Sequence, residues 1–227
     1  MPKINFIGIG AQKCGTTWLD ACLREHPEIY LFQNKEAHFF DSISTLENNL
    51  IEKYELLFNN NSEKIVGEIT PSYIYKEHCH KLIHQYNPDL KLIAILRDPT
   101  QRAISQYKME MSRGSIEPNT GVWDAFSRGL PLYGPMRERG LYEKQLQRYY
   151  SKFSKEQILI LDYEDIKKNA ETLIKNVFNF LEVDSSFIPS KLNEVVQPVT
   201  INKVNVNKED KDKIQIYYEK QSNRNSK

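Results

Sequence analysis

The sequence has few of the features that mark secreted, membrane-spanning or metal-binding proteins. It contains three cysteines, Cys14, Cys22 and Cys79, an odd number without the spacing of a metal site. Such cysteines are typical of free thiols in a reducing compartment, so we expect a cytoplasmic protein. No apolar run approaches the roughly 18 residues of a membrane span. The short apolar stretch after Lys3 also lacks the pattern of a signal peptide, and we expect no membrane partner.

Charge of one sign is not in excess either. Lys and Arg number 31 against 30 Asp and Glu, a net charge of +1, which gives no global basic field to attract nucleic acid. A chain of 227 residues fits one domain with its own core, and no repeat or low-complexity block divides it. We therefore expect one domain over residues 1–227, with a polar C-terminus that frays from about residue 202.

Predicted strands and helices alternate along the chain. Strands are expected over 3–9, 64–70, 91–96 and 158–161, and helices over 17–25, 46–58, 99–112, 141–153 and 164–181. The continuous apolar run KLIAIL is typical of a central parallel strand. Residues 114–140 are rich in Gly and Pro and predict a surface insertion with one short helix around 123–127. The alternation predicts an α/β fold with a central parallel sheet flanked by helices.

A glycine-rich turn, GIGAQKCGTTWL (residues 8–19), follows the first predicted strand. It approaches the phosphate loop G-x-x-x-x-G-K-[ST]. Gly10 and Gly15 have the required spacing, but Thr16 stands where the lysine is expected, and the loop's lysine is Lys13. Flexible backbone, two threonine hydroxyls and a helix N-terminus remain, and these favour an anion. The turn predicts a single P-loop-like domain that binds a phosphorylated ligand; a ligand-free strand-to-helix turn is the alternative.

A second anion site is indicated by LRDPTQRAISQYK, which follows the strand over 91–96. Arg97 emerges at the strand end with a planar guanidinium fork, and Ser105 offers a hydroxyl two turns into the next helix. The alternative is a surface pair of Arg97 with Asp98 and a buried serine. Two anion sites suit a ligand that is phosphorylated at two distant positions.

The segment KEAHFFD, residues 35–41, concentrates titratable groups. Glu36, His38 and Asp41 lie within seven positions, next to two phenylalanines that can anchor the segment. In an extended segment Glu36 and His38 share a face, which suits a general base and its orienting partner. The alternative is a histidine satisfied at a loop edge.

Together these motifs resemble the sulfotransferases that use 3′-phosphoadenosine 5′-phosphosulfate (PAPS). QKCGTTWL and LRDPTQRAISQY are similar to that family's 5′-phosphosulfate loop and 3′-phosphate site. KEAHFFD resembles the branch that contains heparan sulfate sulfotransferases and their bacterial relatives. The resemblance runs from about Lys3 to Leu181. GEITPSYIY is similar to a substrate-side segment in which relatives often carry a lysine where this chain has Ile69, and we expect Ile69 to help shape the acceptor pocket.

The resemblance implies transfer of a sulfuryl group to a hydroxyl or amine of a small-molecule or carbohydrate acceptor, with release of adenosine 3′,5′-bisphosphate (PAP). Lys13 would stabilise the charge that grows on the leaving oxygen, and Glu36 would take the acceptor proton, with His38 as its orienting partner or as the alternative base. No metal is required, and homo-oligomerisation is left open. The implied cofactor-binding residues are Lys13, Cys14, Gly15, Thr16, Thr17, Trp18, Arg97, Ser105 and Lys203, the last from a loosely matched loop around residues 200–207.

Two other functions are compatible with the motifs. A nucleotide kinase with a variant phosphate loop would need Mg²⁺ and lacks the lysine expected after Gly15. A non-catalytic PAP-binding protein is the third hypothesis, because the C-terminal match is loose.

Overall fold

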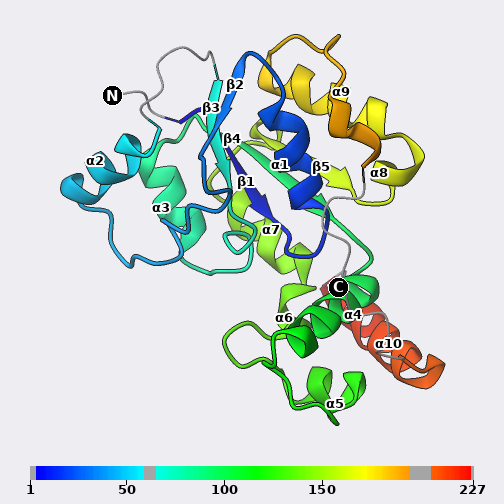
Figure 1. Cartoon of the computed structure of the whole chain (residues 1–227). Helices are drawn as coiled ribbons and strands as arrows, with labels where there is room; N and C mark the ends of the chain where they lie inside the picture. Colours follow the sequence, from blue (N-terminus) through cyan, green and yellow to red (C-terminus); the bar gives the residue numbers. More distant parts are fainter. Residues whose placement is uncertain (1–3, 59–64, 195–205, 226–227) are drawn as a thin grey trace. The chain divides into compact units, whose positions relative to one another are not determined.

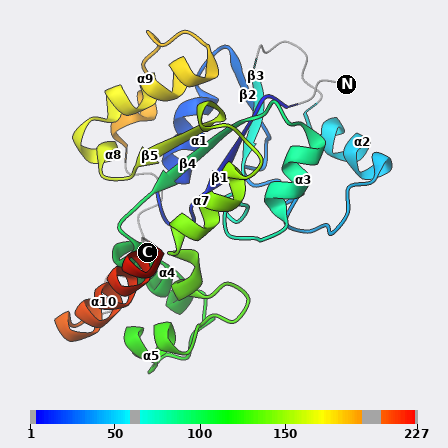
Figure 2. The ribbon, with the colours of Figure 1, turned by 180° about the vertical axis from the view of Figure 1, so that it is seen from behind.

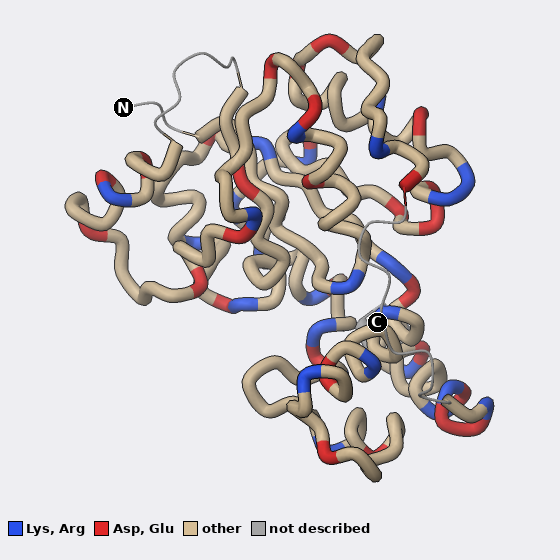
Figure 3. Tube along the Cα trace, viewed as in Figure 1, with Lys and Arg blue, Asp and Glu red and all other residues tan. Residues whose placement is uncertain are grey.

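A computed structural model describes residues 4–58, 65–194 and 206–225 of the chain. The chain divides into two compact units. The first comprises Met1–Leu96 and Leu146–Val196, and the second comprises Arg97–Gln145 and Gln197–Lys227. Basic and acidic residues are interspersed along the elements of both units (Figure 3), in keeping with the near-balanced charge.

The first unit is built on a five-stranded sheet of order β2-β3-β1-β4-β5 in which every pairing is parallel. Its strands are β1 (Phe6–Gly10), β2 (Ile29–Leu31), β3 (Ile65–Ile69), β4 (Lys91–Leu96) and β5 (Ile158–Asp162). The central strand β1 is buried along its whole length, as a strand covered on both faces must be. The predicted α/β fold with a central parallel sheet is confirmed.

Helices cover both faces of this sheet. The first unit holds α1 (Thr16–Arg24), α2 (Asn48–Leu56), α3 (Cys79–Tyr86), α8 (Asp165–Lys168) and α9 (Ala170–Leu181), and α7 (Tyr142–Tyr150) contains the boundary between the units. Helices α1 and α9 lie on one face of the sheet and α3 on the other (Figures 1 and 2). The His26 ring, just after α1, packs 4.5 Å from the Phe178 ring of α9.

The prediction missed β2 and α3, and it merged two helices. β2 has three residues, too short for a periodic signal. Asn169, at φ −147°, leaves the helical region and separates α8 from α9, so the helix predicted over 164–181 is interrupted there.

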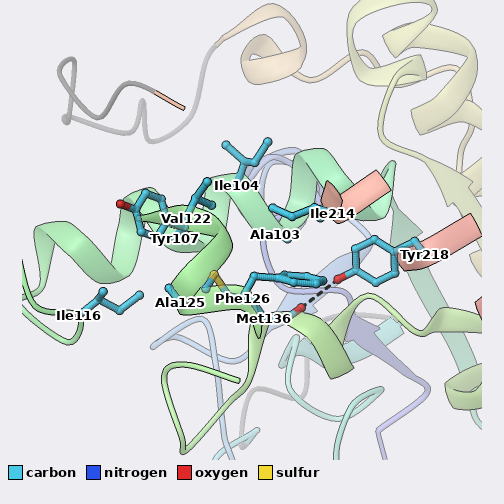
Figure 4. Packing of buried hydrophobic residues seen from close by; sticks show 10 residues of the cluster. All are labelled: Ala103, Ile104, Tyr107, Ile116, Val122, Ala125, Phe126, Met136, Ile214 and Tyr218. Atoms are coloured by element: carbon cyan, nitrogen blue, oxygen red, sulfur yellow. Dashed lines mark hydrogen bonds between the residues drawn. The ribbon is translucent and has the colours of Figure 1, made fainter. Parts of the chain in front are cut away.

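The second unit is helical: α4 (Pro99–Ser112), α5 (Val122–Ser127), α6 (Met136–Arg139) and α10 (Lys208–Asn225). Ile214 and Tyr218 of α10 complete a core formed with residues of α4, α5 and α6, and the Tyr218 hydroxyl bonds the Met136 carbonyl at 3.1 Å (Figure 4). The expected fraying therefore does not hold over Lys208–Asn225. Two apolar residues four positions apart anchor a helix that is polar over most of its length, a pattern that average polarity conceals.

Candidate active site

The phosphate-loop motif joins β1 to α1 at the carboxyl end of the sheet's central strand. Gly15 precedes the helix at φ 90°, and among the described residues no side chain caps α1. The first N–H groups of a helix have no partner inside the helix. The loop therefore offers backbone donors, the helix dipole and the Thr16 and Thr17 hydroxyls, which is the donor set that suits a phosphate.

Gly15 is needed for two independent reasons. Its positive φ disfavours any side chain, and a Cβ there would lie 2.5 Å from Cδ1 of Ile166 and 3.1 Å from Cδ2 of Tyr163. The segment after β5 thus packs directly against the loop and leaves no room for a larger residue.

Cys14 and Trp18, two other residues of the motif, are buried in the fold. The Cys14 side chain is buried, and its N–H donates to the Ala11 carbonyl at 3.2 Å. The Trp18 side chain is also buried; its indole N–H donates to the Leu192 carbonyl at 2.9 Å. Its backbone N–H donates to the Gly15 carbonyl, so neither N–H of Trp18 is available to an anion. Lys13 is half-buried in the left-handed region at φ 69°.

The KEAHFFD segment forms a loop in the same unit, and it brings its three titratable groups together. His38 Nε2 lies 3.1 Å from Oε2 of Glu36, and His38 Nδ1 lies 2.9 Å from Oδ2 of Asp41. The Asp41 carboxylate also accepts a hydrogen bond from the Ser72 hydroxyl. Lys35 and His38 have φ values of 55° and 50°, so the expectation of an extended segment is wrong. The pairing of Glu36 with His38 arises instead from two left-handed residues that curl the loop.

Both ring nitrogens of His38 face carboxylates, and this arrangement favours the protonated form of the ring. Partial burial opposes the charged imidazolium, but the bonds and charges of Asp41 and Glu36 outweigh it and raise the pKa of His38 above its ordinary value. A protonated His38 donates to both carboxylates and so fixes the direction of the Glu36 side chain.

Lys35 connects this loop to the phosphate loop. Its Nζ donates to Oγ1 of Thr17 at 2.9 Å and to Oε1 of Glu36 at 3.0 Å. A continuous series of contacts thus runs from the first turn of α1 through Lys35, Glu36 and His38 to Asp41.

The backbone of the loop is held by a buried polar cluster. Four consecutive N–H groups, those of residues 37–40, donate to side-chain oxygens of Glu68, Thr70 and Tyr73. Glu68 in turn accepts hydrogen bonds from the Thr70, Tyr54 and Tyr73 hydroxyls. This set of four side chains, the Glu68 cluster, fixes the loop to β3 and to the turn that follows it.

Two residues of β3, Glu68 and Ile69, are closed off from any ligand. Glu68, a further carboxylate near the loop that could act as a base in place of Glu36, is fully buried with both oxygens bonded. Burial raises its pKa, although the bonds from Thr70, Tyr54 and Tyr73 oppose the rise. Ile69 is 0% exposed and packs on Gly8, so it does not line an acceptor pocket.

The residues proposed for the second phosphate lie in the second unit. Arg97 directly follows β4, Asp98 accepts the Gln101 N–H at 2.8 Å and starts α4, and Ser105 is half-buried on that helix. Lys203 lies outside the described residues. The joining of Arg97 and Ser105 with the phosphate loop in one site stays a prediction.

In the described part of the chain, no group of three or more His, Cys, Asp or Glu side chains is arranged to hold a metal ion. In the same ranges no helix has both the length and the apolar character that a membrane crossing requires.

A family model for the sulfotransferase domain matches residues 4–227, and thus extends over both units. Heparan sulfate glucosamine 3-O-sulfotransferase 6 of Homo sapiens is 31% identical over 76% of this chain and 50% of that protein. The membrane-associated sulfotransferase kil1 of Dictyostelium discoideum is 27% identical over 79% of this chain and 56% of that protein. The chain therefore spans about half the length of these curated relatives.

Solved structures agree with these relatives. A sulfotransferase from Alicyclobacillus acidocaldarius superposes with a TM-score of 0.74 at 28% identity, covering 87% of this chain and 88% of the other. Mouse sulfotransferase SULT7A1, solved in complex with PAP, shares the fold, with a TM-score of 0.56 at 17% identity over 95% of this chain and 64% of that one.

Proposed function

Because the chain belongs to the sulfotransferase family, we propose that it is a cytoplasmic enzyme that transfers a sulfuryl group from PAPS to a hydroxyl or amine of a small-molecule or carbohydrate acceptor. The observation that carries the proposal is the contact series from Thr17 through Lys35 and Glu36 to His38. It connects an anion-binding helix N-terminus to a carboxylate suited to proton abstraction, and sulfuryl transfer needs both.

The phosphate loop serves the donor side. Backbone N–H groups and the Thr16 and Thr17 hydroxyls hold the 5′-phosphate, and Lys13 lies beside the oxygen on which charge grows as the S–O bond breaks. A fixed cation stabilises such a charge most where it develops. Arg97 and Ser105 hold the 3′-phosphate in this proposal.

Glu36 is the general base in this proposal. His38 has carboxylates at both ring nitrogens, so neither nitrogen is open to an acceptor proton. Glu36 is about one-third exposed and keeps lone pairs for the acceptor. His38 orients Glu36, and Asp41 orients His38.

In the proposed step, one bond to sulfur forms while another breaks. The acceptor oxygen or nitrogen forms a bond to sulfur while the S–O bond to the 5′-phosphate breaks. The acceptor proton passes to Glu36, and the electron pair of the broken bond stays on the phosphate oxygen of PAP, next to Lys13.

Single-turnover transfer from radiolabelled PAPS to a panel of acceptors tests the proposal, alongside calorimetric PAP titration. We expect Lys13→Ala to slow transfer to every acceptor and also to slow PAPS hydrolysis by water. Glu36→Gln should cut transfer by about 10²–10⁴-fold and leave PAP affinity nearly unchanged. His38→Ala should have a smaller effect than Glu36→Gln, since it only orients the base.

Three results would contradict these assignments. Wild-type turnover by Glu36→Gln would show that Glu36 is not the general base. Binding of PAP without any transfer would favour a PAP-binding protein. Stabilisation by ATP plus Mg²⁺ but not by PAP would favour a kinase.

A further inference from the structure

We propose that Lys35 is a second catalytic cation, which contacts the sulfuryl group while it passes from donor to acceptor. The inference rests on the proposed function and extends it to Lys35, to which the sequence motifs assign no role. It is carried by the position of the Lys35 ammonium, which bonds Thr17 of the phosphate loop and Glu36 of the KEAHFFD segment (residues 35–41, the base loop) at the same time.

The position follows from the order of the reacting groups. The sulfuryl group must lie between the 5′-phosphate, held at the first turn of α1, and the acceptor atom, held at Glu36. Lys35 Nζ is within 3.0 Å of an oxygen on each side, 2.9 Å from Thr17 and 3.0 Å from Glu36. Any group that fits between these two oxygens therefore lies against the ammonium.

Lys35 has the capacity for this extra contact. An ammonium has three N–H donors, and within the described residues two of them have these partners, which leaves one. The side chain is 28% exposed, so a ligand can contact it, and its two hydrogen bonds hold the ammonium in place. Its backbone is left-handed at φ 55°, and its ammonium reaches Thr17 in the first turn of α1.

The charge of Lys35 becomes more effective during the reaction. Before transfer, the Glu36 carboxylate compensates the ammonium. As Glu36 takes the acceptor proton it becomes neutral, and the ammonium is left to interact with the sulfuryl oxygens alone. An interaction that strengthens along the reaction lowers the barrier, whereas an equally strong one throughout does not.

The matched control is Lys91. Its side chain is also 28% exposed and pairs with a carboxylate, Glu182 at 2.7 Å, but it lies at the amino end of β4, away from the loops. Lys35→Gln and Lys91→Gln therefore remove the same charge and the same kind of ion pair. Lys35→Arg, which keeps the charge, is the third variant.

Calorimetric titration with PAP and with PAPS separates the sulfuryl contact from a phosphate contact, because only PAPS carries the sulfuryl group. We expect Lys35→Gln to leave the PAP dissociation constant within about twofold and to weaken PAPS binding by about 10- to 100-fold, the value of one hydrogen bond to a charged group. Single-turnover transfer should slow by about 10²–10³-fold. Lys35→Arg should recover part of that rate, and Lys91→Gln should match wild type in every measurement. Melting temperatures verify that each variant is folded.

Two results would overturn the inference. Equal losses for PAP and PAPS in Lys35→Gln would mean that Lys35 acts on the phosphate loop through Thr17, not on the sulfuryl group. If Lys35→Gln behaves like Lys91→Gln, the contact between Lys35 and Glu36 is only a surface ion pair. If wild type binds neither PAP nor PAPS, the proposed function itself fails, which is a different outcome from either of these.

Discussion

At the scale of single residues, His38 gives the site a specific dependence on pH. Its pKa is raised by two carboxylates, so protonated His38 stabilises the fold. For a raised pKa this contribution is complete below the unfolded value of about 6.5 and is lost as the pH rises through the folded pKa. Because the His38 side chain is half-exposed, the contribution should not exceed about 1 kcal/mol.

Urea unfolding of wild type and His38→Gln between pH 5.5 and 8.5 measures this. The difference in unfolding free energy should be largest at the acidic end and shrink as the pH rises. A difference that stays constant with pH would mean that His38 acts through packing alone.

The residues of the site were only partly predictable from sequence. Glu36, His38 and Asp41 could be selected because a carboxylate and a histidine two positions apart, beside two anchoring phenylalanines, suit a general base and its orienting partner. Their pairing could not, since it depends on left-handed backbone at Lys35 and His38, a conformation that is uncommon for residues other than glycine and that the sequence does not mark. Lys35 was overlooked because a lysine beside a glutamate is ordinary in sequence; only its contact with Thr17, eighteen positions earlier, distinguishes it.

At the scale of elements, the base loop depends on the Glu68 cluster. Tyr73→Phe removes the acceptor of the buried Phe40 N–H and the partly buried Phe39 N–H, at a cost of about 1–3 kcal/mol. The loop should then lose its fixed geometry, and the rate of transfer should fall while PAP affinity is kept.

Tyr86→Phe is the matched control for this prediction. The Tyr86 hydroxyl also accepts one buried N–H, that of Ile4, and donates to a carboxylate, that of Glu55. We expect a similar loss of stability by thermal unfolding with no change in the rate of transfer. Equal rate losses in both variants would attribute the effect to general destabilisation.

The turn between β1 and α1 permits a second test. Gly15→Ala should destabilise the fold by about 1–3 kcal/mol through left-handed strain and should also weaken PAP binding, because the loop must move away from Ile166. Gly114→Ala introduces a comparable strain at φ 69°, where a Cβ meets nothing within 4 Å. It should lose stability but keep PAP affinity, measured by calorimetry. Unchanged PAP affinity in Gly15→Ala would show that the turn does not bind PAP.

Elements were predictable where a local rule determined them. β4 and α4 have the predicted bounds, because a continuous apolar run and a proline at the first helical position mark their ends. α10 was misjudged because its stability comes from tertiary contacts of Ile214 and Tyr218, which composition does not reveal.

At the scale of the whole molecule, ligand binding should be visible as stability. The phosphate loop can bind PAP only when β1 and α1 are folded, so PAP at about 100 times its dissociation constant should add about 2.7 kcal/mol to the free energy of unfolding without added metal. Thermal unfolding measures this gain.

Arg97→Ala should weaken PAP binding by about 1.5–3 kcal/mol and leave the binding of adenosine 5′-phosphosulfate, which lacks the 3′-phosphate, nearly unaffected. Calorimetry measures both affinities. Equal losses for the two ligands would show that Arg97 supports the fold and not the 3′-phosphate.

The order of strands in the sheet has a consequence for synthesis of the chain. Phe6 of β1 pairs with Gly67 of β3 and Lys91 of β4, partners that the ribosome makes 61 and 85 positions later. At about 5–20 residues per second, β1 waits roughly 4–17 seconds for its second neighbour. During that interval a strand that is fully buried in the finished protein is exposed with unpaired backbone groups, the condition that leads to aggregation and attracts chaperones. The strand that ends in the phosphate loop is therefore the part of the nascent chain with the greatest need of protection.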